Sequence, residues 1–546
     1  MNDELKLIIP AAKIVPEEIQ RLGKLPGIIY PVNQKITFDY LYEEYKDYCS
    51  SMDIMCYEKA DKVTRRLQKY IGEKVKIKIL PKLSDLGHTV YFGLENVTEP
   101  VIINFADTIV MDNIACVVGD AFYCQEELMS DTWTFFDEQN GSITNIYDKN
   151  SVDTGVRKKL FVGVFQICNS VFFRECLEFA FYAENLHMST FYYALQMYSK
   201  RYPMQAIATE NWFDIGHEDK YYNSKLEVRA REFNHISIDK NRGILRKTSD
   251  DRDKFIGEIQ WYLKLPSDVE YVRPRIFSYS IAYVAPYVSM EYYAYHTVHE
   301  LYLYGDLTRQ QWDEVFERIR FVCNDFKRYS LKDGNIPSSL EDMYLTKTLQ
   351  RFDKMRSDDR FRSLFEKNIT VNGVTYQSLN TVAEMLKRAI PEMLYDVDTF
   401  HIIHGDLCFT NIMVDNNFSF IKVIDPRGKF GTYDIYGDAR YELAKLLHSV
   451  DGKYDFIIKD LFEVSYDLET ASVTYSILDR KRNYDLYKVF LDTFKNEIGN
   501  DIKKIELIEA LLFLSMIPLH GESLDHQMVM LGMGLDILNR VKDIGI

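Results

Sequence analysis

Short apolar runs alternate with stretches of helical spacing over the first third of the chain. Leu5–Ile9 and Val101–Phe105 are mainly apolar segments of five residues each, with a length and a Val/Ile content typical of buried strands. Between them, the segments 38–48 and 61–70 repeat their apolar residues with a helical period. This alternation of strand and helix predicts a mostly parallel, three-layer α/β domain.

The pattern changes near residues 225–232. Phe233–Asp239 and Gly243–Thr248 predict an antiparallel hairpin, and a helix with Phe255, Ile259 and Tyr262 on one face should follow it. From about residue 308 onward the pattern is predominantly helical, interrupted by one β segment between residues 401 and 425. We therefore predict two parts, 1–228 and 229–546, and divide the second into a small lobe (about 229–295) and a large helical lobe (about 296–546).

Composition and charge narrow the classes of function. The 546 residues would accommodate about three or four domains, and 47% hydrophobic with 27% charged residues is an ordinary globular balance. The 66 basic minus 82 acidic residues leave a net charge of −16. Because that charge opposes a sequence-independent grip on phosphate backbones, we expect no nucleic-acid partner.

Membrane insertion and secretion are not expected either. The longest late apolar run, residues 510–519, is shorter than the ~20 residues that span a bilayer. The chain starts with acidic residues, whereas a secretory signal starts with basic ones. Eight cysteines form no C-x-x-C pair, which favours reduced thiols and a cytoplasmic protein.

The stretch 401–428 carries the most specific chemistry. His404-Gly-Asp406 follows an apolar strand, Asn411 comes five residues after Asp406, and Asp425 comes nineteen residues after it. Phosphoryl transfer needs a carboxylate that orients the attacking hydroxyl and further oxygen ligands for the Mg²⁺ on the nucleotide phosphates. We predict Asp406 as the hydroxyl-orienting base, with Asn411 and Asp425 as metal ligands.

These residues resemble the aminoglycoside phosphotransferase and choline kinase family, relatives of the protein kinases, and the resemblance covers roughly residues 230–546. It implies an α+β bilobal fold, Mg²⁺ and ATP. It also implies a phosphate-positioning ion pair, for which Lys247 and Glu258 stand in the expected order and Lys254 is an alternative lysine. By the same resemblance, Glu291 and Tyr292 belong to the lobe-connecting segment whose backbone binds the base. A glycine-rich phosphate loop is nearly absent, so GTP stays open beside ATP.

The first 228 residues carry a second set of motifs. Strand Leu5–Ile9 runs into Pro10-Ala-Ala12, residues 86–90 read Leu-Gly-His-Thr-Val, and residues 210–219 contain Trp212-Phe-Asp214-Ile-Gly216. This order resembles sugar-phosphate and choline-phosphate nucleotidyltransferases. The resemblance implies a Rossmann-like (GT-A-like) sheet, a glycine turn at 86–90, and a Mg²⁺ site formed by Asp107 and Asp214.

This first part departs from that family's pattern in its phosphate loop. No glycine occurs between Ala12 and Gly23, and Pro26-Gly27 stands where the family has Pro-Lys. Lys13, Arg21 and Lys24 are the candidates to replace the missing cation.

The leading hypothesis is a bifunctional enzyme. The second part phosphorylates a hydroxyl of a sugar, polyol or amino alcohol, and the first transfers a nucleotidyl group from CTP or another NTP onto that phosphate. The resemblance places such a product in bacterial capsule or lipopolysaccharide synthesis. The alternative is a small-molecule kinase with a catalytically silent nucleotidyltransferase-like domain. A nucleotide-binding pseudoenzyme is disfavoured because Asp406, Asn411 and Asp425 are all present. The acceptor, the nucleotide of the first part and the oligomeric state are not predicted.

Overall fold

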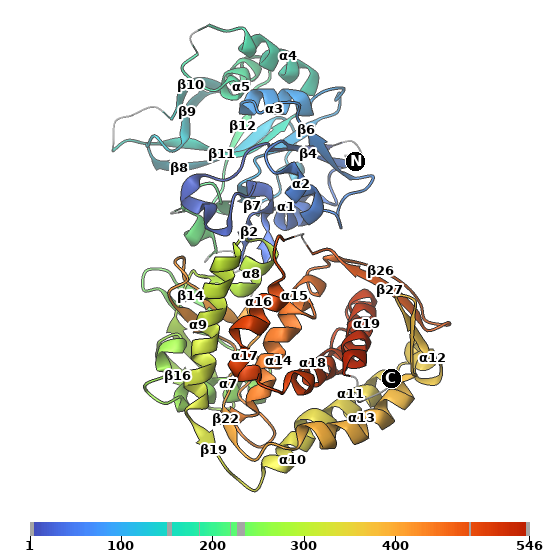
Figure 1. Cartoon of the computed structure of the whole chain (residues 1–546). Helices are drawn as coiled ribbons and strands as arrows, with labels where there is room; N and C mark the ends of the chain where they lie inside the picture. The colour runs from blue at the N-terminus through green and yellow to red at the C-terminus, as the bar shows by residue number, and fades with distance from the viewer. Residues whose placement is uncertain are drawn as a thin grey trace. The chain divides into compact units, whose positions relative to one another are not determined.

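The computed structural model describes residues 5–149, 155–184, 186–218, 220–225, 235–479 and 482–541. The chain divides into two compact units, Met1–Glu232 and Phe233–Ile546, drawn in Figure 1. The predicted boundary near residue 228 falls in the segment 226–234, outside the described residues.

A nine-stranded mixed sheet forms the centre of the first unit. Its strands are β1 (Lys6–Ala11), β4 (Ser51–Cys56), β5 (Val75–Ile79), β6 (Val101–Asn104), β8 (Ala121–Leu128), β9 (Thr134–Gln139), β10 (Ser142–Asp148), β11 (Arg157–Ile167) and β12 (Gln205–Ala208). Strands β5, β4, β1 and β6 are parallel neighbours, whereas β11 runs antiparallel to β6, β8 and β9. The predicted strands at Leu5–Ile9 and Val101–Phe105 are therefore confirmed as β1 and β6. The antiparallel half of the sheet was not predicted.

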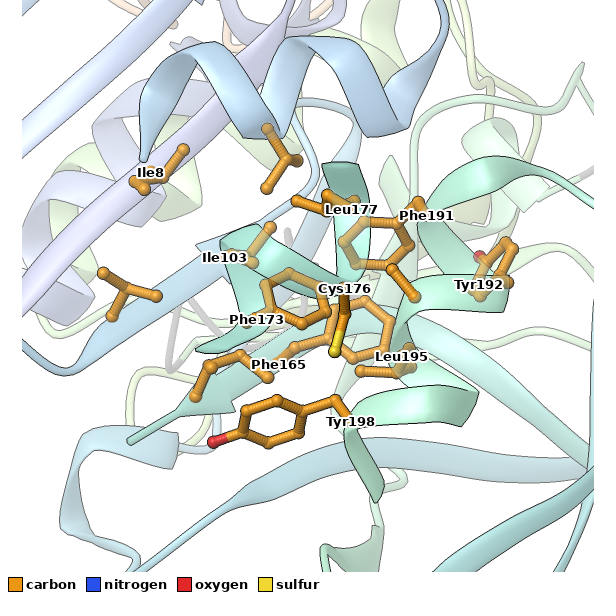
Figure 2. Close-up of a cluster of buried hydrophobic side chains, with 14 of the residues drawn as sticks. Ile8, Ile103, Phe165, Phe173, Cys176, Leu177, Phe191, Tyr192, Leu195 and Tyr198 are labelled. Carbon is orange, nitrogen blue, oxygen red and sulfur yellow. The ribbon is translucent and has the colours of Figure 1, made fainter. Parts of the chain in front are cut away.

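The helices of this unit lie on both faces of the sheet (Figure 1). They are α1 (Thr37–Tyr45), α2 (Ala60–Arg66), α3 (Leu86–Gly93), α4 (Ser170–Phe181) and α5 (Thr190–Arg201). Figure 2 shows the core between the sheet and α3–α5, where Ile8 and Ile103 face aromatic side chains such as Phe173 and Phe191. Leu7, Ile8 and Ile9 are all fully buried, as expected for a parallel strand covered on both faces. The helices predicted at 38–48 and 61–70 are confirmed with earlier ends.

Two small antiparallel pairs complete the first unit. They are β2 (Pro31–Val32) with β3 (Lys35–Ile36), and β7 (Thr108–Val110) with β13 (Trp212–Asp214). The second pair joins the segment after β6 to the segment around Asp214, which lie about a hundred residues apart in the sequence.

The second unit begins with a four-stranded antiparallel sheet, in the order β14-β15-β17-β16, followed by a helix-rich part. The predicted hairpin is confirmed as β14 (Ile236–Asp239) with β15 (Ile244–Lys247), and the predicted helix as α7 (Arg252–Lys264). Phe233 and Asn234 of the predicted hairpin lie outside the described residues. The sheet is completed by β16 (Ile276–Ser280) and β17 (Tyr287–Glu291).

The helix-rich part surrounds short strands that hold the loops of the expected site. Its helices are α8 (Val298–Leu303), α9 (Arg309–Lys327), α10 (Ile336–Leu340), the π-helix η5 (Glu341–Thr346), α11 (Lys347–Arg356), α12 (Arg362–Glu366), α13 (Leu379–Leu394), α14 (Ala439–Val450), α15 (Tyr454–Ile457), α16 (Leu486–Thr493), α17 (Lys495–Ile498), α18 (Ile502–Met516) and α19 (Leu524–Arg540). Helix α9 begins at a capping box between Thr308 and Gln311.

The strands of this part form two three-stranded sheets and one four-stranded sheet. The three-stranded sheets are β18 (His296–Thr297), β23 (Ile412–Val414) and β24 (Ile421–Val423), and β19 (Ser330–Leu331), β22 (Phe400–Ile402) and β25 (Tyr436–Gly437). The four-stranded sheet contains β20 (Ile369–Val371), β21 (Val374–Tyr376), β26 (Phe462–Asp467) and β27 (Ser472–Ile477). The expectation of a single β interruption after residue 308 was wrong. Among the described residues, no helix combines the length and the apolar character needed to cross a bilayer.

Candidate active sites

In the second unit, the hairpin β23–β24 brings the predicted metal ligands close to each other. The two strands are antiparallel, and the backbone N–H of Ile424 donates to the carbonyl of Asn411 at 3.0 Å. Asp425 lies two residues after the end of β24. Its backbone is left-handed, with a φ of 56°, which is a strained conformation for a residue with a side chain and is common at functional sites. The nineteen-residue spacing from Asp406 is therefore the length of a loop and one hairpin.

Asp406 lies between a lysine and an amide. Lys445 Nζ on α14 is 2.8 Å from Asp406 Oδ1, and Asn411 Nδ2 donates to the Asp406 carbonyl (2.9 Å) and to Oδ2 (3.2 Å). Removal from water raises the pKa of Asp406, but the charge and the hydrogen bond of Lys445 outweigh this effect and lower the pKa to about 2. The carboxylate is thus ionised at neutral pH, and its side chain is still 39% exposed.

Glu442 holds the loop that carries Asp406. Its carboxylate accepts the backbone N–H of His404 and of Gly405, both at 2.8 Å. Burial is the main cause that raises the pKa of Glu442 to about 7. His404 Nε2 in turn donates to the Ile424 carbonyl at 3.0 Å, so the loop is tied to the residue that precedes Asp425.

Lys247, Glu258 and Asp425 form one ion-pair network. Lys247 Nζ lies 2.9 and 3.0 Å from the two Glu258 oxygens and 2.8 Å from Asp425 Oδ1. Removal from water lowers the pKa of Lys247, but the negative charges of Asp425 and Glu258 outweigh it, and the net shift is upward. The alternative lysine, Lys254, is exposed. The structure thus brings together the lysine and glutamate that the sequence analysis paired, and adds Asp425 to them.

Two glycines allow α7 to pack closely against the turn after Asp425. Gly428 has a φ of 66°, and a Cβ on it would lie 2.2 Å from the carbonyl carbon of Gly257 on α7. Helix α7 therefore packs backbone to backbone on the turn after Asp425, a contact that places Glu258 beside the network.

Glu291 and Tyr292 do not offer their N–H groups to a base. The Glu291 N–H donates to the Arg275 carbonyl and the Tyr292 N–H to the Gly243 carbonyl, both at 2.8 Å. The Glu291 side chain accepts the Tyr293 hydroxyl at 2.8 Å. A base-binding role for this segment stays a prediction, and it would have to use groups other than these two donors.

The side-chain oxygens of the two predicted metal ligands are chemically suited to Mg²⁺. Asp425 and Asn411 supply the carboxylate and amide oxygens that this ion prefers, and the Asp425 side chain is 48% exposed. The Asp425 carboxylate pairs with the ammonium of Lys247, which it shares with Glu258.

In the first unit, Asp107 and Asp214 come together through the β7–β13 pair. Asp214 is the register partner of Thr108, and the Ile215 N–H donates to the Asp107 carbonyl at 2.8 Å. A Cβ on Gly216 would lie 2.8 Å from Asp107 Oδ2 and 3.4 Å from Asp214 Oδ1, so both carboxylates border the same small space. Burial and then the charge of Asp214 raise the pKa of Asp107 to about 6. Two carboxylates that repel each other in this way fit a site for a divalent cation.

A pocket of about 190 Å³ adjoins Asp107. Its lining includes Ala12, Lys13 and Gly27. Of the three candidate cations, Lys13 therefore lines the pocket with Asp107, Lys24 is exposed and absent from the lining, and the Arg21 side chain lies outside what the structure describes. In place of a glycine-rich loop, residues Glu17–Leu22 form a short 3-10 helix, η1.

The prediction of a glycine turn at residues 86–90 was wrong. These residues form the first turns of α3, capped by Asp85, whose side chain accepts the His88 N–H at 2.9 Å. Gly87 is needed for packing, because a Cβ there would lie 2.1 Å from Thr190 Oγ1 on α5. Leu86 and Thr89 nevertheless line the pocket.

Glu442 and Lys445 were not predicted as parts of the site. Both lie in α14, where every residue from Arg440 to Val450 is buried. A charged pair inside such an apolar pattern is the signal that could have pointed to them, because charged groups are rarely buried without a partner.

No protein-family model matches the chain, and no curated protein matches it at a significant level. Solved structures with similarity to its N-terminal part include one pyrophosphorylase and two transferases. UDP-glucose pyrophosphorylase in complex with UDP-glucose is 15% identical over 42% of this chain and 100% of its own, with a TM-score of 0.36. CTP:phosphocholine cytidylyltransferase of Streptococcus pneumoniae is 14% identical over 41% and 99%, with a TM-score of 0.35. The inositol-1-phosphate CTP transferase of T. maritima is 12% identical over 42% and 97%, with a TM-score of 0.32.

Proposed function

We propose that the chain is a bifunctional enzyme, a small-molecule kinase joined to a nucleotidyltransferase. The single observation that carries the kinase half is the Lys247–Glu258–Asp425 network beside the Asp406–Asn411 loop. Phosphoryl transfer requires a phosphate-positioning lysine, an acidic metal ligand and a hydroxyl-orienting carboxylate, and these side chains belong to three separate segments of one unit.

In the kinase step, the oxygen of an acceptor hydroxyl forms a bond to the γ-phosphorus of ATP, and the bond from that phosphorus to the bridging β–γ oxygen breaks. ADP leaves with the electron pair, and the hydroxyl proton passes to Asp406 and then to solvent. Lys247 holds the nucleotide phosphates, and Glu258 keeps its ammonium in place. Asn411 and Asp425 would hold Mg²⁺, which when bound would supply positive charge to the phosphates.

In the nucleotidyl step, a phosphate oxygen of the phosphorylated acceptor attacks the α-phosphorus of CTP or another NTP. The bond to the α–β bridging oxygen breaks and pyrophosphate leaves. Asp107 and Asp214 are the proposed ligands of the Mg²⁺ that supplies positive charge there, and Lys13 is the cation in the adjoining pocket. Linking the two activities raises the effective concentration of the intermediate.

The product would be a nucleotide-activated sugar, polyol or amino alcohol of the kind used as a precursor for surface polysaccharide. We place the enzyme in the cytoplasm because ATP and the second nucleotide are supplied there.

A two-readout assay tests this proposal. Wild type, Asp406→Asn and Asp107→Asn are incubated with MgATP, a mixed NTP pool and a panel of alcohols and sugars, and ADP and pyrophosphate are measured separately. We expect acceptor-dependent ADP to be lost only in Asp406→Asn, and pyrophosphate to be lost in both variants. Acceptor-independent ADP, unchanged in Asp406→Asn, would overturn the kinase assignment.

The second candidate is a kinase whose first unit is catalytically silent. The observation in its favour is the 3-10 helix η1 in place of a glycine-rich phosphate loop. It predicts that Asp107→Asn and Asp214→Asn leave all turnover intact. ADP without any pyrophosphate, even when phosphorylated product is supplied, would establish this candidate instead of the bifunctional enzyme.

A further inference from the structure

Four basic side chains of the second unit lie close enough to repel one another, and they form what we call the cationic cluster: Lys347, Arg351, Arg427 and Lys445. Two of them, Lys445 and Arg427, also act on the charge of Asp406. The four come from three segments, since the first two lie on α11, Arg427 lies in the turn after β24, and Lys445 lies on α14. The proposed kinase chemistry uses none of the first three.

Arg427 is fixed against the Asp406 loop. Its N–H donates to the His404 carbonyl at 3.0 Å, and a Cβ on Gly405 would lie 2.9 Å from the Arg427 Cβ. Its Nη1 donates to the Tyr441 hydroxyl at 2.9 Å. Tyr441 and Lys445 are four residues apart on α14 and therefore lie on the same face of that helix.

The π-helix η5, which continues directly into α11, approaches the same place. The Tyr344 ring lies 6.3 Å from the Tyr441 ring, and the Tyr344 hydroxyl donates to Asp438 at 2.9 Å at the start of α14. Lys347 comes three residues after Tyr344, at the end of the π-helix η5, an irregularity that frequently marks functional sites. Arg351 follows one turn later on the same face.

The cluster carries more positive than negative charge. Burial and then the positive charges of Arg427, Arg351 and Lys445 lower the pKa of Lys347 to about 7, and Asp342 acts weakly in the opposite direction. Among the described residues, no carboxylate forms an ion pair with Lys347, Arg351 or Arg427. The acid that is paired is Asp406, with Lys445. Half-buried cations that repel one another are costly to hold together unless an anion joins them.

We propose that the cationic cluster is the binding site for an anionic group of the kinase acceptor, so that the acceptor is a hydroxylated carboxylic acid or phosphate ester. This inference rests on the proposed kinase function and narrows its substrate class. The guanidinium groups of Arg351 and Arg427 offer the paired donors that carboxylate and phosphate accept. A cationic amino alcohol is disfavoured, because its ammonium would add to the existing repulsion.

Binding of inorganic phosphate tests the site without relying on turnover. Titration calorimetry of the full chain is carried out with a saturating non-hydrolysable ATP analogue, which occupies the nucleotide phosphate site. We expect wild type to bind inorganic phosphate at least about tenfold more tightly than the double variant Lys347→Gln/Arg351→Gln, since the variant lacks two charge-assisted contacts to the anion. The control is Lys354→Gln, an exposed lysine on the same helix, which should bind like wild type. Equal phosphate affinity in wild type and the double variant would overturn the proposal.

A matched acceptor series tests the substrate class. Glycerol, glycerate, glycerol 3-phosphate and 3-amino-1,2-propanediol share one carbon skeleton and differ in charge. We expect acceptor-dependent ADP release to be fastest with one of the two anions, which also tells carboxylate from phosphate, and slowest with the amine. In the double variant, KM for that anion should rise with little change in kcat. Faster reaction with glycerol or the amine would overturn the anionic acceptor while leaving the kinase assignment intact, whereas the Asp406→Asn comparison decides the kinase assignment itself.

Discussion

Lys247 Nζ lies 2.8 Å from Asp425 Oδ1, although 178 residues separate the two in the chain. Lys247 ends a strand of the first sheet of its unit, and Asp425 lies two residues after the end of a hairpin strand in the helix-rich part. The ammonium also binds both oxygens of Glu258. One cation therefore joins the sheet, helix α7 and the loop that carries the expected metal ligand.

Replacing this cation should abolish most kinase turnover. We expect Lys247→Met to lower kcat/KM for acceptor-dependent ADP release by about 10²–10³-fold, the usual loss when one preorganised contact to the transition-state charge is removed. The control is Lys254→Met, because Lys254 is exposed on α7. Full activity in Lys247→Met, measured by coupled ADP detection, would contradict the proposed role.

Lys445 should set the acidic limb of the kinase pH profile. Its ammonium offsets the effect of desolvation and holds the pKa of Asp406 at about 2, so wild type keeps an ionised base throughout the stable pH range. In Lys445→Met that pKa should rise by about 1–3 units, as expected on loss of an adjacent opposite charge. Activity should then fall at a higher pH on acidification.

The measurement is kcat/KM for ADP release from about pH 3.5 to 9, a range that includes the expected pKa of Asp406 in the variant. The conservative variant Lys445→Arg should restore part of the acidic activity because it keeps the positive charge. A Lys445→Met profile with the same acidic limb as wild type would show that Lys445 does not act on Asp406.

Gly428→Ala should separate α7 from the Asp425 turn. The left-handed φ of 66° costs about 1–2 kcal/mol for a residue with a Cβ. The 2.2 Å approach to Gly257 adds an overpacking cost of about 1–3 kcal/mol. Urea unfolding should show the sum of these two costs as a lower free energy of unfolding. Gly373→Ala is the control, since Gly373 also has a positive φ, 82°, but nothing lies within 4 Å of its Cβ position. Equal losses in the two variants would rule out the packing contribution.

Gly216→Ala should impair the nucleotidyl half alone. The new Cβ would lie 2.8 Å from Asp107 Oδ2, and moving that carboxylate by ~1 Å would lower pyrophosphate release by about 10²-fold. ADP release should be unchanged. Gly72→Ala serves as the control because nothing lies within 4 Å of that position. Normal pyrophosphate release in Gly216→Ala would mean that Asp107 does not need its present position.

Lys347→Gln should stabilise the protein at low pH more than at high pH. The folded pKa of Lys347, about 7, lies below its ordinary value of 10.5 because of burial and of Arg427, Arg351 and Lys445, with Asp342 opposing. The unfolded chain therefore binds more protons between these values, so this lysine makes the free energy of unfolding increase as pH rises from 7 to 10.5. Below pH 7 the full destabilising effect of the charged Lys347 on the folded protein is present. The gain in Tm of the variant over wild type should be larger at pH 6 than at pH 9, and a pH-independent difference would refute the repulsion.

Short spacings between residues in the sequence predict much of the candidate site in the second unit. His404, Asp406, Asn411 and Asp425 lie in one loop and one hairpin, and a hairpin fixes which residues meet because its register follows from the turn. The strand that contains Lys247 and the helix that contains Glu258 are also predicted from local patterns of apolar residues. Their chemical roles remain predictions.

The sequence by itself determined the local elements: the β–α alternation around β1 and β6, the β14–β15 hairpin, α7 and the β23–β24 hairpin. Only the tertiary structure decided which groups of certain distant elements meet, namely Lys445 with Asp406, Lys347 near Arg427, and Gly428 with Gly257. It also decided that the N–H groups of Glu291 and Tyr292 are used internally and that β20, β21, β26 and β27 form a sheet. The periodicity of the sequence indicates which face of an element is apolar. The element against which that face packs depends on the sum of many weak contacts across the whole fold.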